Sequence, residues 1–438
     1  MSFFGPISLP ALNEASTPIN RALHRARVVG NFAFVQAVVQ VIGFLSGILL
    51  IRYLDQREYA YFTIANTMQG TLNVLADIGI SIGLVSIGGR VWHDRHRFGQ
   101  LIKTASILRR KLGAIAAIVV TPILVIMLIK NGAPLPYTIL LIALVLIGLS
   151  IQLSLGVLGV VPRLLSDVRR IQTIDLVGAL FRLLLVVVLM RLFLNSIVAV
   201  AVGAASLLVQ YLMLHHYAVR AVNLDAPEHE EDRAAMQGFI RKLAANAIFF
   251  AFQGQITIFL ISFFGRSISS VAEVGALGRL AMVFTVLTNL LTNVFGPAFA
   301  RCHDPRRLRW QFALIVGGVA GFSALLIGAA ELFPRAFLFV LGAKYAHLDR
   351  ELVLMVSGAV VGALTGTFWT LNASKAWIAG SWLYIPLTLS TQIALIPMTD
   401  FSSVRSVLIF NLLSAIPNLL LNLVLSIRGL RTSFSLAA

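Results

Sequence analysis

The sequence predicts an all-α polytopic membrane protein that crosses the bilayer about twelve times. Its 438 residues are 58% hydrophobic and only 12% charged, with a mean hydropathy of +0.89, whereas a soluble domain is about 25% charged. The apolar runs are continuous and reach roughly the 20 residues that a bilayer-spanning helix needs. Alternating patterns are absent from these runs, which excludes an outer-membrane barrel. The composition also excludes a soluble globular fold and a disordered chain.

Each predicted span is a helix, because hydrocarbon offers backbone groups no partner outside their own segment. The longest charged connection in the middle of the chain, 217–242, divides the spans six and six. The predicted organisation is therefore a cytoplasmic N-terminal segment 1–29, an N-lobe 30–216, a cytoplasmic linker 217–242, a C-lobe 243–427 and a cytoplasmic tail 428–438. The spans are 30–51, 60–88, 112–129, 137–161, 173–194, 197–216, 243–265, 273–299, 311–331, 352–371, 379–398 and 406–427.

The distribution of basic residues predicts that both termini are cytoplasmic. In this topology 24 of the 35 Lys and Arg residues lie on the N-terminal side and 9 on the opposite side, as the positive-inside rule describes. The net charge of +17 is then mainly an orientation signal and a contact with anionic lipid. The basic loops hold few interleaved aromatic residues, so no nucleic-acid partner is expected. The single cysteine, Cys302, excludes a disulfide framework and a thiolate metal site, and no P-loop motif is present.

A weak internal repeat supports the division into two lobes. Asn31, Arg52 and the run from Glu58 to Tyr61 are matched, at similar offsets, by Asn246, Arg266 and the run from Glu273 to Ala276. An even number of spans in each half makes the repeat parallel, and transporters commonly place their substrate site between such halves.

Polar residues recur at helical spacing within several predicted spans. Polar amides that face lipid are costly, so these stripes indicate a hydrated internal cavity. The alternative is hydrogen bonding between helices. The stripes are Asn66, Gln69, Asn73, Asp77 and Ser81; Asn411, Ser414, Asn418 and Asn422; Arg279, Asn289 and Asn293; Gln36 and Gln40; and Asn246, Gln253 and Thr257.

Four charged residues lie well inside predicted spans: Asp77, Asp175, Arg182 and Arg279. Charges within a membrane are costly and are functional candidates by default. Asp175 and Arg182 are seven residues apart, which places them two helical turns apart on one face; they could pair through water, or each could pair elsewhere. A guanidinium such as that of Arg279 can bind phosphate oxygens in bidentate fashion.

Three short motifs resemble the polysaccharide flippase family, the translocases of O-antigen and exopolysaccharide repeat units. This family is a branch of the superfamily that also contains the MATE transporters. The first motif is Leu50-Ile51-Arg52-Tyr53-Leu54 with Glu58-Tyr59-Ala60-Tyr61 and Ala76-Asp77-Ile78-Gly79-Ile80; the second is Glu273-Val274-Gly275-Ala276 with Arg279-Leu280 and Pro297; the third is Val340-Leu341-Gly342-Ala343-Lys344-Tyr345. Asp55 and Ala60 depart from the pattern, because the family usually has Gly at both positions.

The resemblance implies two six-helix lobes that form a V, as in MATE transporters, and a cationic central cavity for the diphosphate of a polyprenyl-linked oligosaccharide. By matched position it nominates Arg52 and Arg279 for phosphate contact, and the charge argument adds Arg182. Asn66, Asn73, Asn289 and Asn293 are the candidates for sugar contact, and Asp77 and Asp175 for a coupled ion. The expected partners are the lipid-linked glycan, membrane lipids and other polysaccharide assembly proteins in a bacterial inner membrane, and no cofactor is expected.

Two other functions stay open from the sequence. A drug or cation antiporter of the same fold predicts a net acidic cavity, whereas the charges well inside the predicted spans are two Asp and two Arg. A membrane-embedded polysaccharide polymerase or ligase requires a large outer loop with catalytic residues, and the segment 332–351 is short and apolar. The sequence therefore favours a transporter over an enzyme.

Overall fold

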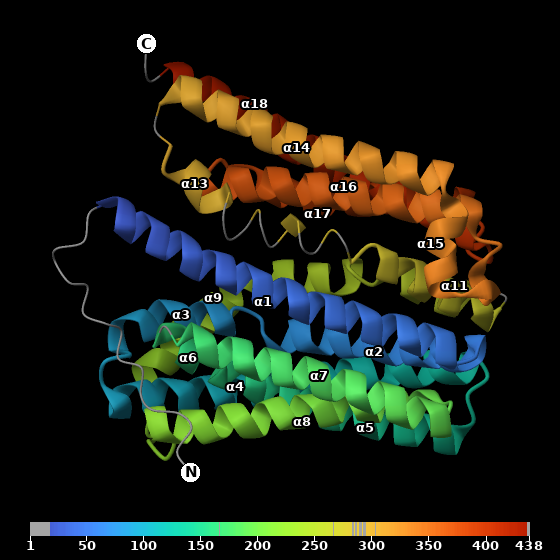
Figure 1. Cartoon of the computed structure of the whole chain (residues 1–438), viewed down its shortest axis with the longest axis horizontal. Coiled ribbons are helices and arrows are strands. Elements are labelled where there is room, and N and C mark those ends of the chain that lie inside the picture. Colours follow the sequence, from blue (N-terminus) through green and yellow to red (C-terminus); the bar gives the residue numbers. More distant parts are fainter. Residues whose placement is uncertain are drawn as a thin grey trace.

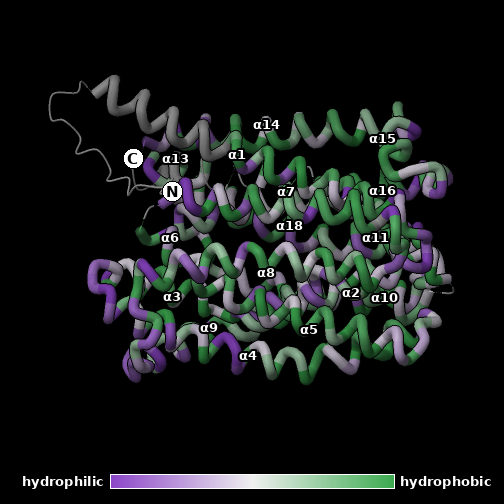
Figure 2. The backbone as a smooth tube through the Cα atoms, turned by 60° about the horizontal axis from the view of Figure 1, so that its bottom comes forward, coloured by the Kyte–Doolittle hydropathy of each residue, from purple (hydrophilic) through white to green (hydrophobic). Residues whose placement is uncertain are grey.

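The computed structural model describes residues 18–435 except 166, 266, 283, 285–286, 289–290, 292–294 and 303. Over these residues the fold is entirely helical, which confirms the predicted fold class. Eight described helices are long and apolar enough to cross a membrane, or up to ten if each of two bent pairs forms one span. Figure 2 shows hydrophobic residues along the middle of the bundle and hydrophilic residues gathered toward its two ends.

The N-lobe packs its long helices as a bundle in which α1 contacts α7, α7 contacts α8, and α5 contacts α4, α8 and α2. A large apolar core that includes Leu72, Leu128 and Val145 fills it. Its helices are α1 (Pro18–Tyr53), α2 (Gln56–Ala76), α3 (Ile80–Val91), α4 (Arg95–Lys130), α5 (Leu135–Leu158), α6 (Val160–Leu164), α7 (Val168–Leu192) and α8 (Ser196–Ala221).

The C-lobe is built around α16 and α18, which α14 and α17 flank. Its α-helices are α9 (Glu230–Gln253), α10 (Ile256–Phe264), α11 (Ile268–Leu280), α13 (Gly296–Ala300), α14 (Pro305–Leu332), α15 (Pro334–Leu341), α16 (Asp349–Ser374), α17 (Tyr384–Leu395) and α18 (Val404–Ser435). Three single turns of 3₁₀ helix accompany them: η2 (Ala343–Tyr345), η3 (Ser381–Leu383) and η4 (Ile396–Met398).

Figure 1 shows that α1 begins and α18 ends at one end of the molecule, which we call the near end. The opposite end, where α15 and the beginning of α11 lie, is the far end. The lobes contact each other there, through α1 against α15 and α2 against α11, and α9 also packs along α2, α3 and α4 of the N-lobe. Gly275 of α11 permits the second contact, because a Cβ at that position would lie 2.5 Å from the Thr63 hydroxyl oxygen of α2.

Two predicted spans are bent rather than straight. The span 60–88 divides into α2 and α3 at an angle of 45°, and the span 243–265 divides into α9 and α10 at 52°. At the first bend Gly79 adopts φ +72°, and a Cβ there would lie 3.1 Å from the Phe239 backbone of α9. Only glycine adopts this left-handed conformation routinely, so an apolar run that reads as continuous is interrupted.

Two further predicted spans are not among the ten. The span 273–299 lies partly outside the described residues. The span 379–398 appears as α17, a helix of only 12 residues between two turns of 3₁₀ helix. The number of described spans is therefore lower than the twelve predicted from hydropathy.

Aspartate and asparagine residues begin several helices by accepting hydrogen bonds from first-turn N–H groups. Asp55 accepts from the Glu58 N–H at 2.7 Å, which accounts for its presence where the resembled family has Gly. At the start of α4, backbone hydrogen bonds from Arg97 and His96 hold the pKa of Asp94 below its ordinary value. The Glu58 carboxylate in turn accepts from the Ser196 N–H at 2.6 Å and from the Tyr137 hydroxyl, so it joins α2 to α5 and α8.

The connection between the lobes is folded onto the N-lobe at the near end. Asp232, in the first turn of α9, is 4% exposed and forms a bidentate ion pair with Arg97 of α4, at 2.5 and 2.7 Å. The His229 N–H donates to the Thr104 hydroxyl at 3.0 Å. Asp232 therefore neutralises part of the basic near end of the N-lobe.

Candidate functional site

A cavity of about 520 Å³ lies inside the N-lobe, between α1, α2, α5, α7 and α8. Arg279 and Met282 of the C-lobe line its side nearest the second lobe. The sequence analysis expected the substrate cavity between the two lobes. The cavity lies within the N-lobe instead because of where the polar side chains point. Asn66, Gln69, Gln152 and Gln210 of the N-lobe line this space, whereas C-lobe amides such as Gln253 and Asn422 bond within their own lobe.

Two arginines give the cavity its positive charge. Arg182 of α7 and Arg279 of α11 both line it, and their guanidinium groups are near enough to repel each other. Among the described residues neither forms an ion pair with a carboxylate, and the Arg182 Nε is buried without a hydrogen-bond partner. The Arg279 guanidinium lies 6.0 Å from the ring centroid of Phe62. The Arg279 side chain is half-buried and also donates to the Met282 sulfur at 4.0 Å. Because neither guanidinium is neutralised by a carboxylate, this pair is suited to an anion.

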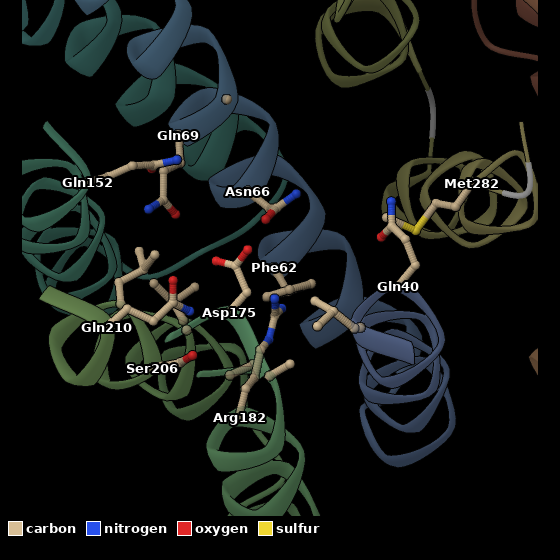
Figure 3. Close-up of a pocket in the computed structure, with 18 of the residues that line it drawn as sticks. Gln40, Phe62, Asn66, Gln69, Gln152, Asp175, Arg182, Ser206, Gln210 and Met282 are labelled. Carbon is tan, nitrogen blue, oxygen red and sulfur yellow. The ribbon is translucent and has the colours of Figure 1, made fainter. Parts of the chain in front are cut away.

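Asp175 is the carboxylate of the cavity, and it lies two turns before Arg182 on α7. Figure 3 shows both side chains directed into the cavity. The Gln36 amide of α1 donates to the Asp175 carboxylate at 3.2 Å. Asp175 therefore has a neutral partner, and its charge remains available to a cation or a proton.

Five amide side chains also line the cavity: Gln40, Asn66, Gln69, Gln152 and Gln210. None of the five forms a side-chain hydrogen bond within the part of the chain that the structure describes. Asn66 is exposed and the four glutamines are half-buried on the cavity wall, so these groups are free to bind water or a polar ligand.

Several polar residues of the C-lobe stripes form hydrogen bonds between helices, which is the alternative to a cavity that the sequence left open. The Gln392 amide donates to Gln253 at 2.9 Å and the Tyr384 hydroxyl donates to Asn246 at 2.9 Å, which joins α9 to α17. Between α16 and α18, Asn372 donates to the Asn422 carbonyl at 2.9 Å, and Asn422 donates to Asn418. Asn246, Gln253, Asn418 and Asn422 therefore bond within the lobe, whereas Arg279, from the remaining C-lobe stripe, lines the cavity.

A smaller cavity of about 290 Å³ continues the first toward the near end of the N-lobe, and both are lined by Gln152, Asp175, Leu207 and Gln210. Arg163 of α6, Asn73 and Arg109 line the extension. Arg109 is only 4% exposed and pairs with Asp77 at 3.2 Å. Asp77, a candidate for ion coupling, is thus already engaged, and it also accepts from the Ser81 hydroxyl at 2.7 Å.

Arg52 does not join Arg182 and Arg279. It lines a separate cavity of about 610 Å³ at the far end, with Arg335 and Lys344. Its guanidinium donates to the carbonyls of Phe339 at 2.7 Å and Val340 at 3.1 Å. Of the remaining candidates, Asn66 and Asn73 line the N-lobe cavities, whereas Asn289 and Asn293 lie outside the described residues.

Sequence reasoning missed Arg109, Gln152 and Gln210. Arg109 precedes Arg110 and Lys111, which made it resemble a solvated loop although α4 continues through all three residues. Gln152 and Gln210 are single amides in otherwise apolar runs, and the cost of burying a lone amide was the signal that could have found them. No group of three or more His, Cys, Asp or Glu residues that could hold a metal occurs in the searched, described part of the chain.

Comparison with solved structures identifies the fold. An inward-facing structure of a multidrug resistance MATE family transporter of the MOP superfamily superposes with a TM-score of 0.69 at 15% identity, covering 91% of this chain and 99% of that one. An outward-facing structure of such a transporter gives 0.56 at 14% identity, covering 92% and 94%. A MOP superfamily transporter from Pyrococcus furiosus, for which a binding pocket of reverse polarity is said to suggest a different function, gives 0.55 at 15% identity, covering 89% and 92%. No protein-family model and no curated protein matches the sequence. The chain is therefore a multi-pass membrane protein with the MATE fold.

Proposed function

We propose that the protein flips a polyprenyl-diphosphate-linked oligosaccharide from the cytoplasmic to the outer leaflet of a bacterial inner membrane by alternating access. The observation that carries this proposal is the pair of arginines, Arg182 and Arg279, that share one cavity without a carboxylate partner. Two neighbouring guanidinium groups suit a diphosphate, because each can donate to two oxygens of the anion.

The rest of the cavity fits the other parts of such a substrate. Asn66 and Asn73 offer amide donors and acceptors for sugar hydroxyls, since a hydroxyl also both donates and accepts. The polyprenyl tail would stay in the surrounding lipid while the polar head crosses. Polysaccharide assembly proteins would supply and consume this lipid-linked glycan.

The membrane potential supplies a driving force for this export. A diphosphate of charge about −2 that leaves an inside-negative cell releases roughly 4–5 kcal/mol across about 100 mV. Asp175 is the better candidate for a coupled proton or sodium ion, because Asp77 is paired with Arg109. In this orientation the near end is cytoplasmic. The far-end contact between the lobes and the higher TM-score with the inward-facing structure support a cavity reached from the near end.

The MATE fold equally accommodates a drug or cation antiporter, for which Asp175 would be the binding carboxylate. The two functions require opposite charges in the same cavity. Removing an arginine should abolish binding of an anion and strengthen binding of a cation, and this difference separates them.

The test is transport by the full chain in proteoliposomes that contain labelled lipid-linked glycan. We expect Arg279→Ala and Arg182→Ala each to lower the flipping rate at least tenfold, because a lost charge-assisted hydrogen bond costs about 1.5–3 kcal/mol. Arg335→Ala, which removes an arginine from the far-end cavity, is the matched control and should leave the rate unchanged. Undiminished flipping by Arg279→Ala contradicts the proposal, and uptake of a cationic dye that increases in this variant favours the antiporter.

A further inference from the structure

Three of the unbonded glutamines gather on one side of the N-lobe cavity. Figure 3 shows Gln69, Gln152 and Gln210 on the side away from Gln40 and Met282. They come from α2, α5 and α8. Gln152 and Gln210 lie where the main cavity meets its near-end extension, because they line both, and Gln69 lines the main cavity. Three adjacent amides without protein partners present donors and acceptors together.

Glycines on the facing helices make room for two of these side chains. A Cβ at Gly178 of α7 would lie 2.1 Å from the Gln210 Nε2 and 2.5 Å from its Cγ, and a Cβ at Gly148 of α5 would lie 2.9 Å from the Gln69 Nε2. The Ser206 hydroxyl donates to the Gly178 carbonyl at 2.9 Å, which holds α8 close to α7 at this level. Glycine is unfavourable inside a helix, so its presence under both glutamines requires a reason such as the placement of these amides.

The charges at this side of the cavity are balanced. Arg109 is paired with Asp77, and Arg163 and Asp175, which both line the near-end extension, contribute one charge of each sign. The unbalanced positive charge lies instead at Arg182 and Arg279. The glutamine side is therefore suited to a neutral group rich in hydroxyls, and the arginine side to an anion.

We propose that Gln69, Gln152 and Gln210 form a hydroxyl-binding subsite that holds the sugar portion of the substrate, and that Gly148 and Gly178 are positioning residues for this subsite. This inference rests on the proposed function and adds the orientation of the substrate. The diphosphate lies against Arg182 and Arg279, and the glycan extends from it toward the near end of the N-lobe.

The experiment compares farnesyl diphosphate with farnesyl diphosphate that carries one glucose, galactose or N-acetylglucosamine, each binding to the purified full chain. We expect at least one sugar to lower the Kd of the wild-type protein about tenfold, as several hydrogen bonds to hydroxyls would. Gln210→Leu removes one amide, and Gly178→Ala displaces it; each should reduce this gain about 3- to 10-fold. Both should leave the Kd of farnesyl diphosphate itself unchanged.

Gly317→Ala is the matched control, because Gly317 of α14 lines none of the three cavities and a Cβ there would meet nothing within 4 Å. It should behave as the wild-type protein does. Gln210→Leu keeps the test valid if Gly178→Ala fails to fold. The subsite is contradicted if no sugar improves binding, or if the variants weaken farnesyl diphosphate and its glycosides equally. Absence of farnesyl diphosphate binding, or binding that survives Arg182→Ala and Arg279→Ala, contradicts the proposed function and the subsite with it.

Discussion

Arg109 and Asp77 form a charge pair that is buried on one side only. The arginine side chain is 5% exposed and the aspartate side chain 33% exposed. The guanidinium lies directly over Gly156 of α5, where a Cβ would be 2.1 Å from its Nη1. The aspartate is therefore the main compensation for a cation that the protein holds away from water.

Because of this pairing, Asp77→Asn should destabilise the protein by about 2–3 kcal/mol. The value lies below the 3–5 kcal/mol typical of a fully buried pair, since Asp77 is partly solvated. Thermal unfolding in detergent measures it. The double variant Asp77→Asn with Arg109→Gln should recover most of the loss, because no unpaired charge remains. A double variant that is no more stable than Asp77→Asn would show that pairing with Arg109 is not how Asp77 stabilises the protein.

At the scale of elements, the far end is closed by cations that cap the helices of the opposite lobe. Arg52, near the end of α1, donates to the last carbonyls of α15, and Lys344, just after α15, donates to the carbonyls of Arg52 and Leu54 that end α1. Lys130, at the end of α4, likewise donates to the Phe263 carbonyl at the end of α10. Terminal carbonyls and the negative end of the helix dipole both favour such cations.

These caps must break before the far end can open. Removing those between α1 and α15 with Arg52→Ala and Lys344→Ala should shift the population toward a form open at the far end by at least about tenfold, because each hydrogen bond contributes about 0.5–1.5 kcal/mol. Spin labels at Arg57 and Asp349, in a Cys302→Ser background, report the distance between the lobes. Arg335→Ala is the control, since Arg335 lines the same cavity but forms no hydrogen bond among the described residues. An unchanged distance distribution in the double variant would show that these caps do not hold the far end closed.

For the whole molecule, hydropathy and charge predict the fold class well, because membrane insertion depends on the same apolar runs that a sequence displays. The positions of the bends at Gly79 and Gly254 were not predicted, since they depend on a backbone conformation and on the packing of α9 rather than on polarity.

The candidate site was predicted in part. Arg182 and Arg279 follow from the cost of a charge within a span, whereas the separation of Arg52 from them depends on which carbonyls of α15 lie beside it. Polar stripes alone cannot distinguish a free amide such as Gln210 from a bonded one such as Gln253.

The longest-range consequence concerns α9, which contacts both lobes. Its beginning is held to the N-lobe by the Arg97–Asp232 ion pair, and its later part is held to α17 by Asn246 and Gln253. If the lobes rock as rigid bodies, α9 must yield between these two attachments, around the predicted lobe boundary at 243. The beginning of α9 then moves with α4 throughout the transport cycle.

Two cross-links test this division in the Cys302→Ser background. Linking Thr104→Cys to His229→Cys with a short bifunctional maleimide joins α4 to the start of α9, whose backbone already bonds to Thr104 at 3.0 Å. Transport should continue at nearly the uncross-linked rate, because both positions belong to one moving body. Linking Gln56→Cys to Lys344→Cys, across the hydrogen bond of 3.3 Å between the Gln56 amide and the Lys344 carbonyl, should block transport until the linker is cleaved, because it locks the far end closed. Inhibition by the first cross-link would instead mean that the beginning of α9 moves with the C-lobe, and that the buried Arg97–Asp232 pair separates in every cycle.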